Sequence, residues 1–266
     1  MTTVKDIIRY VEGLAGHRLN ADETVGHGTA DRTVTGVTVC WMATPEAIRA
    51  CAEQGHELLI GHESLYYPYN APNAANLPDG WERWPVNRQR RELLSEHVLT
   101  FLRIHGSADE IAIFDAFAEM LELGQPIVEE GLVKVYEIAP CPLGTLVSRV
   151  KRQVGMDGLR ISVPETYGDP MEETVHRVGL PWGGLGLFVN VEYQQRLIEQ
   201  GCDVFVAGES DNYGFRFARE AGIPMIETSH EVSENPGLVV FTQMLQAKFT
   251  DVTFEFFEND TAWQMA

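Results

Sequence analysis

The stretch EQGHELLIGHES (residues 53–64) occurs a second time in the chain, as EQGCDVFVAGES (residues 199–210). Five of the twelve aligned positions are identical, and the central positions are apolar in both copies. In each copy a glycine typical of a helix end precedes a short apolar run typical of a buried strand. The phrase therefore predicts the same helix–strand unit in both halves of the chain.

The residues before the first copy extend this unit to a βαβ motif. Residues 33–42 are rich in β-branched side chains and predict a strand. Thr44 is suited to the N-cap of a helix, Pro45 to its first position and Gly55 to its C-terminal end. A second short strand follows at residues 57–60, and a strand–helix–strand order favours parallel pairing.

Helices and strands alternate through the rest of the chain. Helices are predicted at 3–15, in a segment that ends near residue 97, and at 113–124, 145–155, 190–201 and 214–221. Strands are predicted at 98–104, 131–139, 159–164, 175–180, 203–210, 224–230 and 250–260. We therefore predict the α/β class, with two related lobes whose duplicated sheets are flanked by helices and face each other about a pseudo-twofold axis. The lobes span approximately 1–124 and 125–266 within a single 266-residue unit.

Composition narrows the class of protein. With 44% hydrophobic residues, 266 residues can bury one large core or two packed lobes. No apolar run approaches twenty residues, the N-terminus lacks a signal-peptide core, and the four cysteines are scattered, so a reduced cytoplasmic protein without membrane contact is expected. A net charge of −19 disfavours nucleic acid as a partner, although a bound divalent ion could reverse the local field for a small anionic substrate.

Imidazole and carboxylate side chains gather where the predicted strands end. Ligands of open parallel sheets bind beyond the carboxyl ends of the strands. Imidazole nitrogen and carboxylate oxygen suit Zn, Mn, Fe or Ni, and a carboxylate can bridge two ions. We therefore predict a dinuclear metal site in the cleft between the lobes. The candidates are His62, Glu63, Asp109, His230 and Glu234, with His105 close by.

Each candidate also has a structural explanation. Asp109 could be the N-cap of the following helix, which would be the favoured role if it stood alone. Glu63 could be a solvated charge and His62 a capped strand end. His230 and Glu234 could be a surface pair in a loop.

The second copy of the phrase adds weaker candidates. Glu209 occupies the position equivalent to Glu63, and Asp211 and Tyr213 follow it. These three residues could contact a substrate or support the metal ligands. The glycine-rich segment 181–186 could present backbone N–H groups to an anion, but it lacks the lysine of a P-loop, so a tight structural turn is the favoured role.

These segments together resemble the Nif-three-like family (NGG-one-interacting-factor-three-like, also known as GTP cyclohydrolase 1 type 2-like) over nearly the whole chain. The opening helix KDIIRYVEGLAG is similar to that of the family. TPEAIRACAEQGHELLIGHESLYY resembles its helix, strand and His-His-Pro-Leu segment, and IHGSADEIAIFDAFAEML resembles its His-Thr-Asn-Leu-Asp segment. DVFVAGES and IETSHEVSENPGL resemble its Gly-Asp/Glu strand end and its Gly-His-x-x-Ser-Glu segment.

The resemblance implies a toroidal homohexamer with two divalent metal ions in each subunit, of Zn, Mn, Fe, Ni or Mg. The implied ligands are His62, Asp109, His230 and Glu234, with position 63 as the fifth. His105 is implied to lie beside the metals as a proton carrier and is our candidate catalytic residue.

The chain departs from the family at Glu63, where the family has a second histidine, and at Ser64, where it has proline. A carboxylate in place of a neutral imidazole adds one negative charge. It also makes the ligand set richer in oxygen, which shifts the preference toward Mn or Mg relative to Zn. The alternative is a partly decayed site in which Glu63 only fills the gap.

Two functions are expected from these features. One is a metal-dependent hydrolase, GTP cyclohydrolase-like, acting on a nucleotide or another small molecule. The alternative is a non-catalytic metal-binding or metal-handling scaffold of toroidal assembly. A mobile lid formed by residues 66–92, with Trp81 and Trp84, would favour catalysis, and a loop packed between subunits would favour assembly. A DNA-associated ring is disfavoured by the charge, unless arginines line its pore (Arg88, Arg90 and Arg91).

Overall fold

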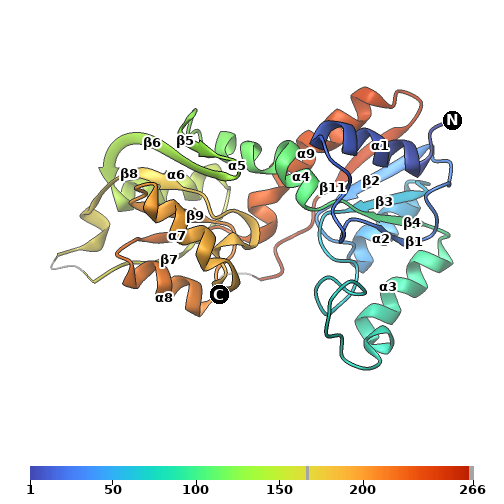
Figure 1. The fold of residues 1–266 in the computed structure, drawn as a ribbon, viewed down its shortest axis with the longest axis horizontal. Helices are drawn as coiled ribbons and strands as arrows, with labels where there is room; N and C mark the ends of the chain where they lie inside the picture. The colour runs from blue at the N-terminus through green and yellow to red at the C-terminus, as the bar shows by residue number, and fades with distance from the viewer. Residues whose placement is uncertain (166–167, 264–266) are drawn as a thin grey trace. The chain divides into compact units, whose positions relative to one another are not determined.

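The chain folds into two compact units in the computed structural model, which describes residues 1–165 and 168–263 (Figure 1). Unit 1 consists of Met1–Ile113 and Gly237–Asn259, and unit 2 of Phe114–Pro236 with the residues from Asp260 onward. The bounds differ from those of the approximate lobes, because the segment 237–259 belongs to unit 1 rather than to the second half of the chain.

Unit 1 is built on a five-stranded sheet in the order β1-β4-β3-β2-β11. Four neighbouring strands are parallel, and β1 is the antiparallel edge strand. The strands are β1 (Val25–His27), β2 (Gly36–Cys40), β3 (Leu58–Gly61), β4 (Thr100–Arg103) and β11 (Thr253–Phe257). The helical segments are α1 (Val4–Ala15), α2 (Pro45–Glu53), η1 (Trp81–Arg83), α3 (Pro85–Glu96), α4 (Gly106–Ala108), η2 (Asp109–Ile113) and the second part of α9 (His230–Lys248).

Helix α1 shows how local sequence sets an element of unit 1. Thr3 and Asp6 form a reciprocal capping box at its start, and Gly16 ends it with a φ of 76°. Val4, Ile7 and Val11 form its buried face, as their spacing predicts. In Figure 1, α1 and the C-terminal end of α9 lie on one side of the sheet, and α2 and α3 on the other.

The loop that follows β3 packs onto unit 1. Trp81 contacts the core cluster formed around α2 and β3, and its ring centroid lies 5.8 Å from that of Tyr66. Asn87, which is fully buried, donates to the carbonyls of Tyr67 and Trp81 and accepts from the amide of Tyr67. Residues 66–92 are therefore anchored to unit 1 through Trp81 and Asn87.

Unit 2 is built on a six-stranded mixed sheet in the order β5-β6-β8-β9-β10-β7. Strands β8, β9 and β10 are parallel, while β5, β6 and β7 pair antiparallel with their neighbours. The strands are β5 (Pro126–Glu130), β6 (Val133–Pro142), β7 (Arg160–Ser162), β8 (Thr174–Gly179), β9 (Val204–Ala207) and β10 (Met225–Glu227). The helical segments are α5 (Phe114–Met120), α6 (Leu143–Gln153), η3 (Pro170–Glu172), η4 (Gly183–Gly186), η5 (Phe188–Asn190), α7 (Val191–Glu199), α8 (Asn212–Glu220) and the start of α9.

The repeated phrase has the same local structure in both units. Helices α2 and α7 each end just before a left-handed glycine, Gly55 with a φ of 73° and Gly201 with a φ of 86°. Strands β3 and β9 follow, and each pairs in parallel with the next strand of its own sheet, β4 or β10. The helix–strand unit predicted from the sequence, and the α/β class, are confirmed.

The long helix α9 is an element that the sequence patterns did not predict. It contains Pro236, which lacks the N–H of a regular helical turn, and the boundary between the units follows this residue. Apolar residues are spread around the helix, so it lacks the polar face by which a surface helix is identified. The strand that follows it, β11, was predicted at 250–260, but its place beside β2 in unit 1 was not.

Candidate metal centre

In unit 1 the end of β3 carries His62 and Glu63, which are 1% and 3% exposed. Their amides continue the parallel pairing beyond β2, because the amide of Glu63 donates to the carbonyl of Trp41 at 2.8 Å. His62 Nδ1 lies 3.2 Å from the carbonyl oxygen of Ile104. A carbonyl can only accept, so the proton is on Nδ1 and Nε2 is the nitrogen suited to a metal.

The next strand brings His105 and Asp109 to the same place. Asp109 Oδ1 is 3.7 Å from His62 Nε2, and His105 Nε2 is 4.0 Å from Glu63 Oε1. Asp109 begins η2, a π-helical turn inside a helical run that starts at Gly106. It is therefore not the N-cap of the helix. His62, Glu63 and His105 each offer one ligand atom within 4.8 Å of the others.

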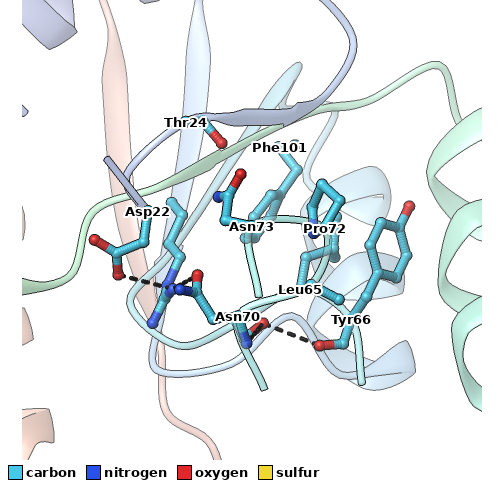
Figure 2. A pocket seen from close by; sticks show the side chains of 12 residues that line it. Asp22, Thr24, Leu65, Tyr66, Asn70, Pro72, Asn73 and Phe101 are labelled. Atoms are coloured by element: carbon cyan, nitrogen blue, oxygen red, sulfur yellow. Dashed lines mark hydrogen bonds and ion pairs between the residues drawn. The ribbon is translucent and has the colours of Figure 1, made fainter. Parts of the chain in front are cut away.

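A buried arginine lies beside these groups. Arg103 donates from Nε to the carbonyl of His62 at 3.1 Å. Its Nη1 donates to Asn70 Oδ1 at 3.0 Å and forms an ion pair with Asp22 at 2.9 Å (Figure 2). Its Nη2 is 3.9 Å from Glu63 Oε2. One guanidinium thus faces two carboxylates, Asp22 and Glu63. Its single positive charge is shared between them, and Asp22 is the closer partner.

Asp22 also contacts His105. Its Oδ2 is 3.3 Å from His105 Nδ1, and this hydrogen bond, together with the charge of Arg103, holds the pKa of the carboxyl below its usual range despite burial. Asp22 is therefore ionised near neutral pH and acts only as an acceptor.

Glu23 fixes the backbone around His105. Its carboxylate, almost fully buried, accepts from the amides of His105 at 2.7 Å and Ser107 at 2.9 Å, and from Ser107 Oγ at 2.7 Å. It also accepts from the amide of Asn20 at 2.6 Å. The segment that carries Asp22 and Glu23 lies outside every predicted helix and strand, and it supplies two carboxylates that orient His105.

A small pocket of about 30 Å³ opens next to Arg103. Figure 2 shows Asp22 and Asn70 at its polar end and Phe101, Pro72 and Tyr66 around its apolar end. The pocket is small, and the polar groups at its end are already paired with Arg103.

In unit 2 the corresponding residues are His230, Glu234 and Glu209. His230 and Glu234 are one turn apart at the start of α9, with 3.2 Å between Nε2 and Oε1. Glu209 Oε2 is 2.9 Å from His230 Nδ1. Since an ionised carboxylate only accepts, Nδ1 carries the proton and Nε2 faces Glu234. Glu63 and Glu209 are the last glutamates of the two copies of the repeated stretch. Each faces the histidine that follows the next strand, which is His105 for Glu63 and His230 for Glu209.

The glycine-rich segment 181–186 packs against His230 and Glu234. Gly183 has a φ of 50°, and a Cβ at this position would collide with Glu234 Oε1 and lie 3.2 Å from His230 Nε2. The amide of Gly183 donates to Ser233 Oγ at 2.9 Å, so it is already used within the fold. The segment is the tight turn that was favoured, and it forms a wall of the site.

Asp211 and Tyr213 belong to a structural motif. Asp211 is the N-cap of α8 and accepts from the amides of Tyr213 and Gly214 at 2.9 and 2.8 Å. Tyr213 is 68% exposed, and its ring centroid lies 5.4 Å from that of Phe188. A contact with substrate stays a prediction for these two residues.

Four residues around the site were missed by sequence reasoning. The sequence does carry a signal for Arg103, since a charged residue inside an apolar strand is rarely buried unless it has an ion-pair partner. Asp22, Glu23 and Tyr69 lie in irregular segments without periodicity, and nothing in their spacing connects them to His105.

A buried carboxylate near the end of β10 predicts a pH dependence. Burial raises the pKa of Glu227 to about 7, although Arg160, 3.1 Å away, opposes the shift. Between the ordinary value of 4.5 and about 7, the folded protein holds a proton that the unfolded chain has lost. The free energy of unfolding should therefore fall as pH rises through this interval, by roughly 2–3 kcal/mol.

Urea denaturation of wild type and Glu227→Gln from pH 5 to pH 8 tests this expectation. The glutamine variant should lose this part of the pH dependence and be the more stable protein at pH 8. Parallel pH profiles for the two proteins would contradict the assignment to Glu227.

The Duf34/NIF3 (NGG1p interacting factor 3) family model matches residues 2–262. Relatives named GTP cyclohydrolase 1 type 2 homolog include one from Neisseria meningitidis serogroup B, 23% identical over 91% of this chain and 90% of its own, and one from Clostridium perfringens, 20% identical over 94% of each.

Solved structures share the fold. A Bacillus cereus protein related to NIF3 has a TM-score of 0.80 at 14% identity and covers 100% of this chain and 99% of its own. Staphylococcus aureus protein SA1388 has a TM-score of 0.76 at 16% identity with the same coverage. None of the helices in the described residues is both long and apolar enough to cross a bilayer. The resemblance seen in the sequence is confirmed, and the chain belongs to the Duf34/NIF3 family.

Proposed function

We propose that the chain is a hydrolase dependent on two divalent metal ions, acting on a small phosphorylated or cyclic-amide compound. The observation that carries the proposal is the group of His62, Glu63 and His105, whose ligand atoms lie within 4.8 Å at largely buried positions. Asp109 Oδ1 lies 3.7 Å from Nε2 of His62. The names of the relatives support nucleotides as the first substrates to test.

The donor set fits Zn, Mn, Fe, Ni or Mg. His62 and His230 each keep Nδ1 against an acceptor and turn Nε2 toward a carboxylate, the arrangement typical of metal-ligating histidines. The proposed ligands are His62, Glu63, Asp109, His230 and Glu234. This number of protein donors suits two ions.

When bound, two such ions lower the pKa of a water molecule and stabilise a leaving oxygen. His105 would carry the proton, since its Nε2 faces Glu63 and its Nδ1 is held by Asp22. Arg103 lies 3.9 Å from Glu63 and reduces the repulsion between its carboxylate and that of Asp22. Glu209 orients His230.

Metal content per chain tests the centre directly. Elemental analysis of untagged protein, purified without chelator, should give about two ions per chain for wild type and none for the double variant Asp109→Ala/His230→Ala. A single variant that keeps its full metal content would exclude the replaced residue as a ligand. No metal in wild type would overturn the proposal.

The same measurement tests the effect of Glu63. Wild type should retain Mn or Mg in preference to Zn when equal amounts are offered, and Glu63→His should shift the preference toward Zn. Identical metal profiles for the two proteins would refute a role of Glu63 in selectivity.

A non-catalytic metal-binding scaffold is the second candidate. The observation that favours it is that Trp81, partly buried, packs against the core of unit 1, so a mobile lid at this residue does not support catalysis. This candidate predicts bound metal without turnover. If a broad substrate panel showed metal-loaded wild type and Asp109→Ala to be alike, the scaffold would replace the hydrolase. Light scattering of the purified protein tests the homohexamer that we include in both proposals.

A further inference from the structure

Tyr69 combines an exposed ring with a hydroxyl group that is fixed inside the site. The residue is 55% exposed. Its hydroxyl oxygen accepts from Arg103 Nη2 at 2.8 Å, and its ring lies over the same guanidinium with 5.2 Å between Cζ and the ring centroid. The neighbouring Asn70 is held at both ends, because its amide donates to Ser64 Oγ at 3.0 Å and its Oδ1 accepts from Arg103. The position of the hydroxyl is therefore set by the surrounding fold.

The hydrogen-bonding capacity of each group determines where the protons are. A guanidinium has only donors, so the phenol oxygen accepts from Arg103 and its own proton remains to be donated. His105 Nε2 is 3.4 Å away and can take it. On the other side of the imidazole, Nδ1 is 3.3 Å from the Asp22 carboxylate, which only accepts. A neutral His105 ring therefore carries its proton on Nδ1 and its lone pair on Nε2.

We propose that Tyr69 is a positioning residue for His105, whose hydroxyl, oriented by Arg103, donates to Nε2 and holds the ring in the tautomer with its proton on Nδ1 facing Asp22. The edge of the Tyr69 ring also abuts the imidazole, with 6.4 Å between the centroids and 70° between the planes. The tautomer and the orientation of the ring are thus set by one loop residue and one carboxylate, neither of which is a proposed metal ligand.

The functional consequence rests on the proposed hydrolase. Nε2 is also the nitrogen nearest to Glu63, so the lone pair that Tyr69 stabilises lies on the side of the candidate ligands. In the proposed reaction this nitrogen takes up the proton. Tyr69 keeps the lone pair of the neutral ring aimed at this side before substrate binds, because the opposite tautomer would place a donor against the phenol proton and leave Asp22 facing a lone pair.

Nitrogen-15 NMR of the histidine rings in the metal-free full-length protein tests the tautomer. Long-range proton–nitrogen spectra are compared for wild type and variants, and His105→Gln identifies the resonances of His105. We expect Nδ1 of His105 in the protonated range and Nε2 in the acceptor range, displaced by a hydrogen bond. Tyr69→Phe should move Nε2 toward the value of a free acceptor, and Asp22→Asn should produce a mixture of tautomers.

Tyr67→Phe is the matched control, since it makes the same chemical change two residues away. The Tyr67 hydroxyl lies 3.7 Å from Met42 Sδ, and Arg90 lies over its ring, so this residue is outside the network. It should leave the resonances of His105 unchanged. A proton on Nε2 of His105 in wild type, or an unchanged Nε2 resonance in Tyr69→Phe, would overturn the proposal.

Turnover separates this inference from the proposed function. With metal content equal to that of wild type, Tyr69→Phe should lose activity by about 10–100-fold, and Tyr67→Phe should remain close to wild type. If wild type showed no turnover, the hydrolase would fail while the NMR result still decided the role of Tyr69. Equal activity of Tyr69→Phe and wild type would show that the tautomer does not serve catalysis.

Discussion

Replacing Arg103 with alanine is expected to lower the free energy of unfolding by about 3–5 kcal/mol, because it leaves buried charge without a partner. The side chain is only 5% exposed. It holds the Asp22 carboxylate, the side-chain oxygens of Asn70 and Tyr69, and the carbonyl of His62. Without Arg103, Asp22 would keep its contact with His105 but lose its closest cation, so the alanine variant should also loosen the segment that carries His105.

Urea denaturation followed by tryptophan fluorescence measures this loss. Arg88→Ala is the matched control, since Arg88 pairs with Glu92 at the surface with its side chain 60% exposed, and its removal should change stability by no more than about 0.5 kcal/mol. Arg103→Lys should be intermediate, because it keeps the charge but loses the planar fork of donors. Similar losses in Arg103→Ala and Arg88→Ala would show that the buried network does not stabilise unit 1.

Gly183→Ala is expected to abolish metal binding in a protein that still folds. The added Cβ would collide with Glu234 Oε1 and approach His230 Nε2. The carboxylate is the end of a flexible side chain and can rotate away, so the collision displaces a proposed ligand rather than the backbone. The left-handed φ of 50° adds strain of about 1–2 kcal/mol, which a protein of this size can tolerate.

Gly222→Ala separates the strain from the collision. Gly222 has a φ of 80° and no atom within 4 Å of an added Cβ, so alanine there brings the same kind of backbone strain without touching the site. Both variants should lose similar stability in urea, but only Gly183→Ala should lose metal by elemental analysis. A Gly183→Ala protein with its full metal content would exclude Glu234 as a ligand in its present position.

The sequence by itself determined those features that depend on neighbours in the chain. The capping box of α1, the helix that begins at Pro45 and the glycines that end α2 and α7 follow from the preferences of a few adjacent residues. The alternation of helices with short apolar strands indicated the α/β class for the same reason. The placement of histidines and acids at strand ends also followed, because a short strand fixes where its last residue lies.

Only the tertiary structure decided which distant residues meet. The joining of β11 to β2 depends on packing between segments more than two hundred residues apart, and α9 is stabilised by burial that overrides Pro236. Asp22, Arg103 and Tyr69 meet around His105 because a loop, a strand and a second loop converge there. Hydrogen bonds and ion pairs act through space and leave no periodic trace in the sequence, so the support of His105 became visible only in the fold.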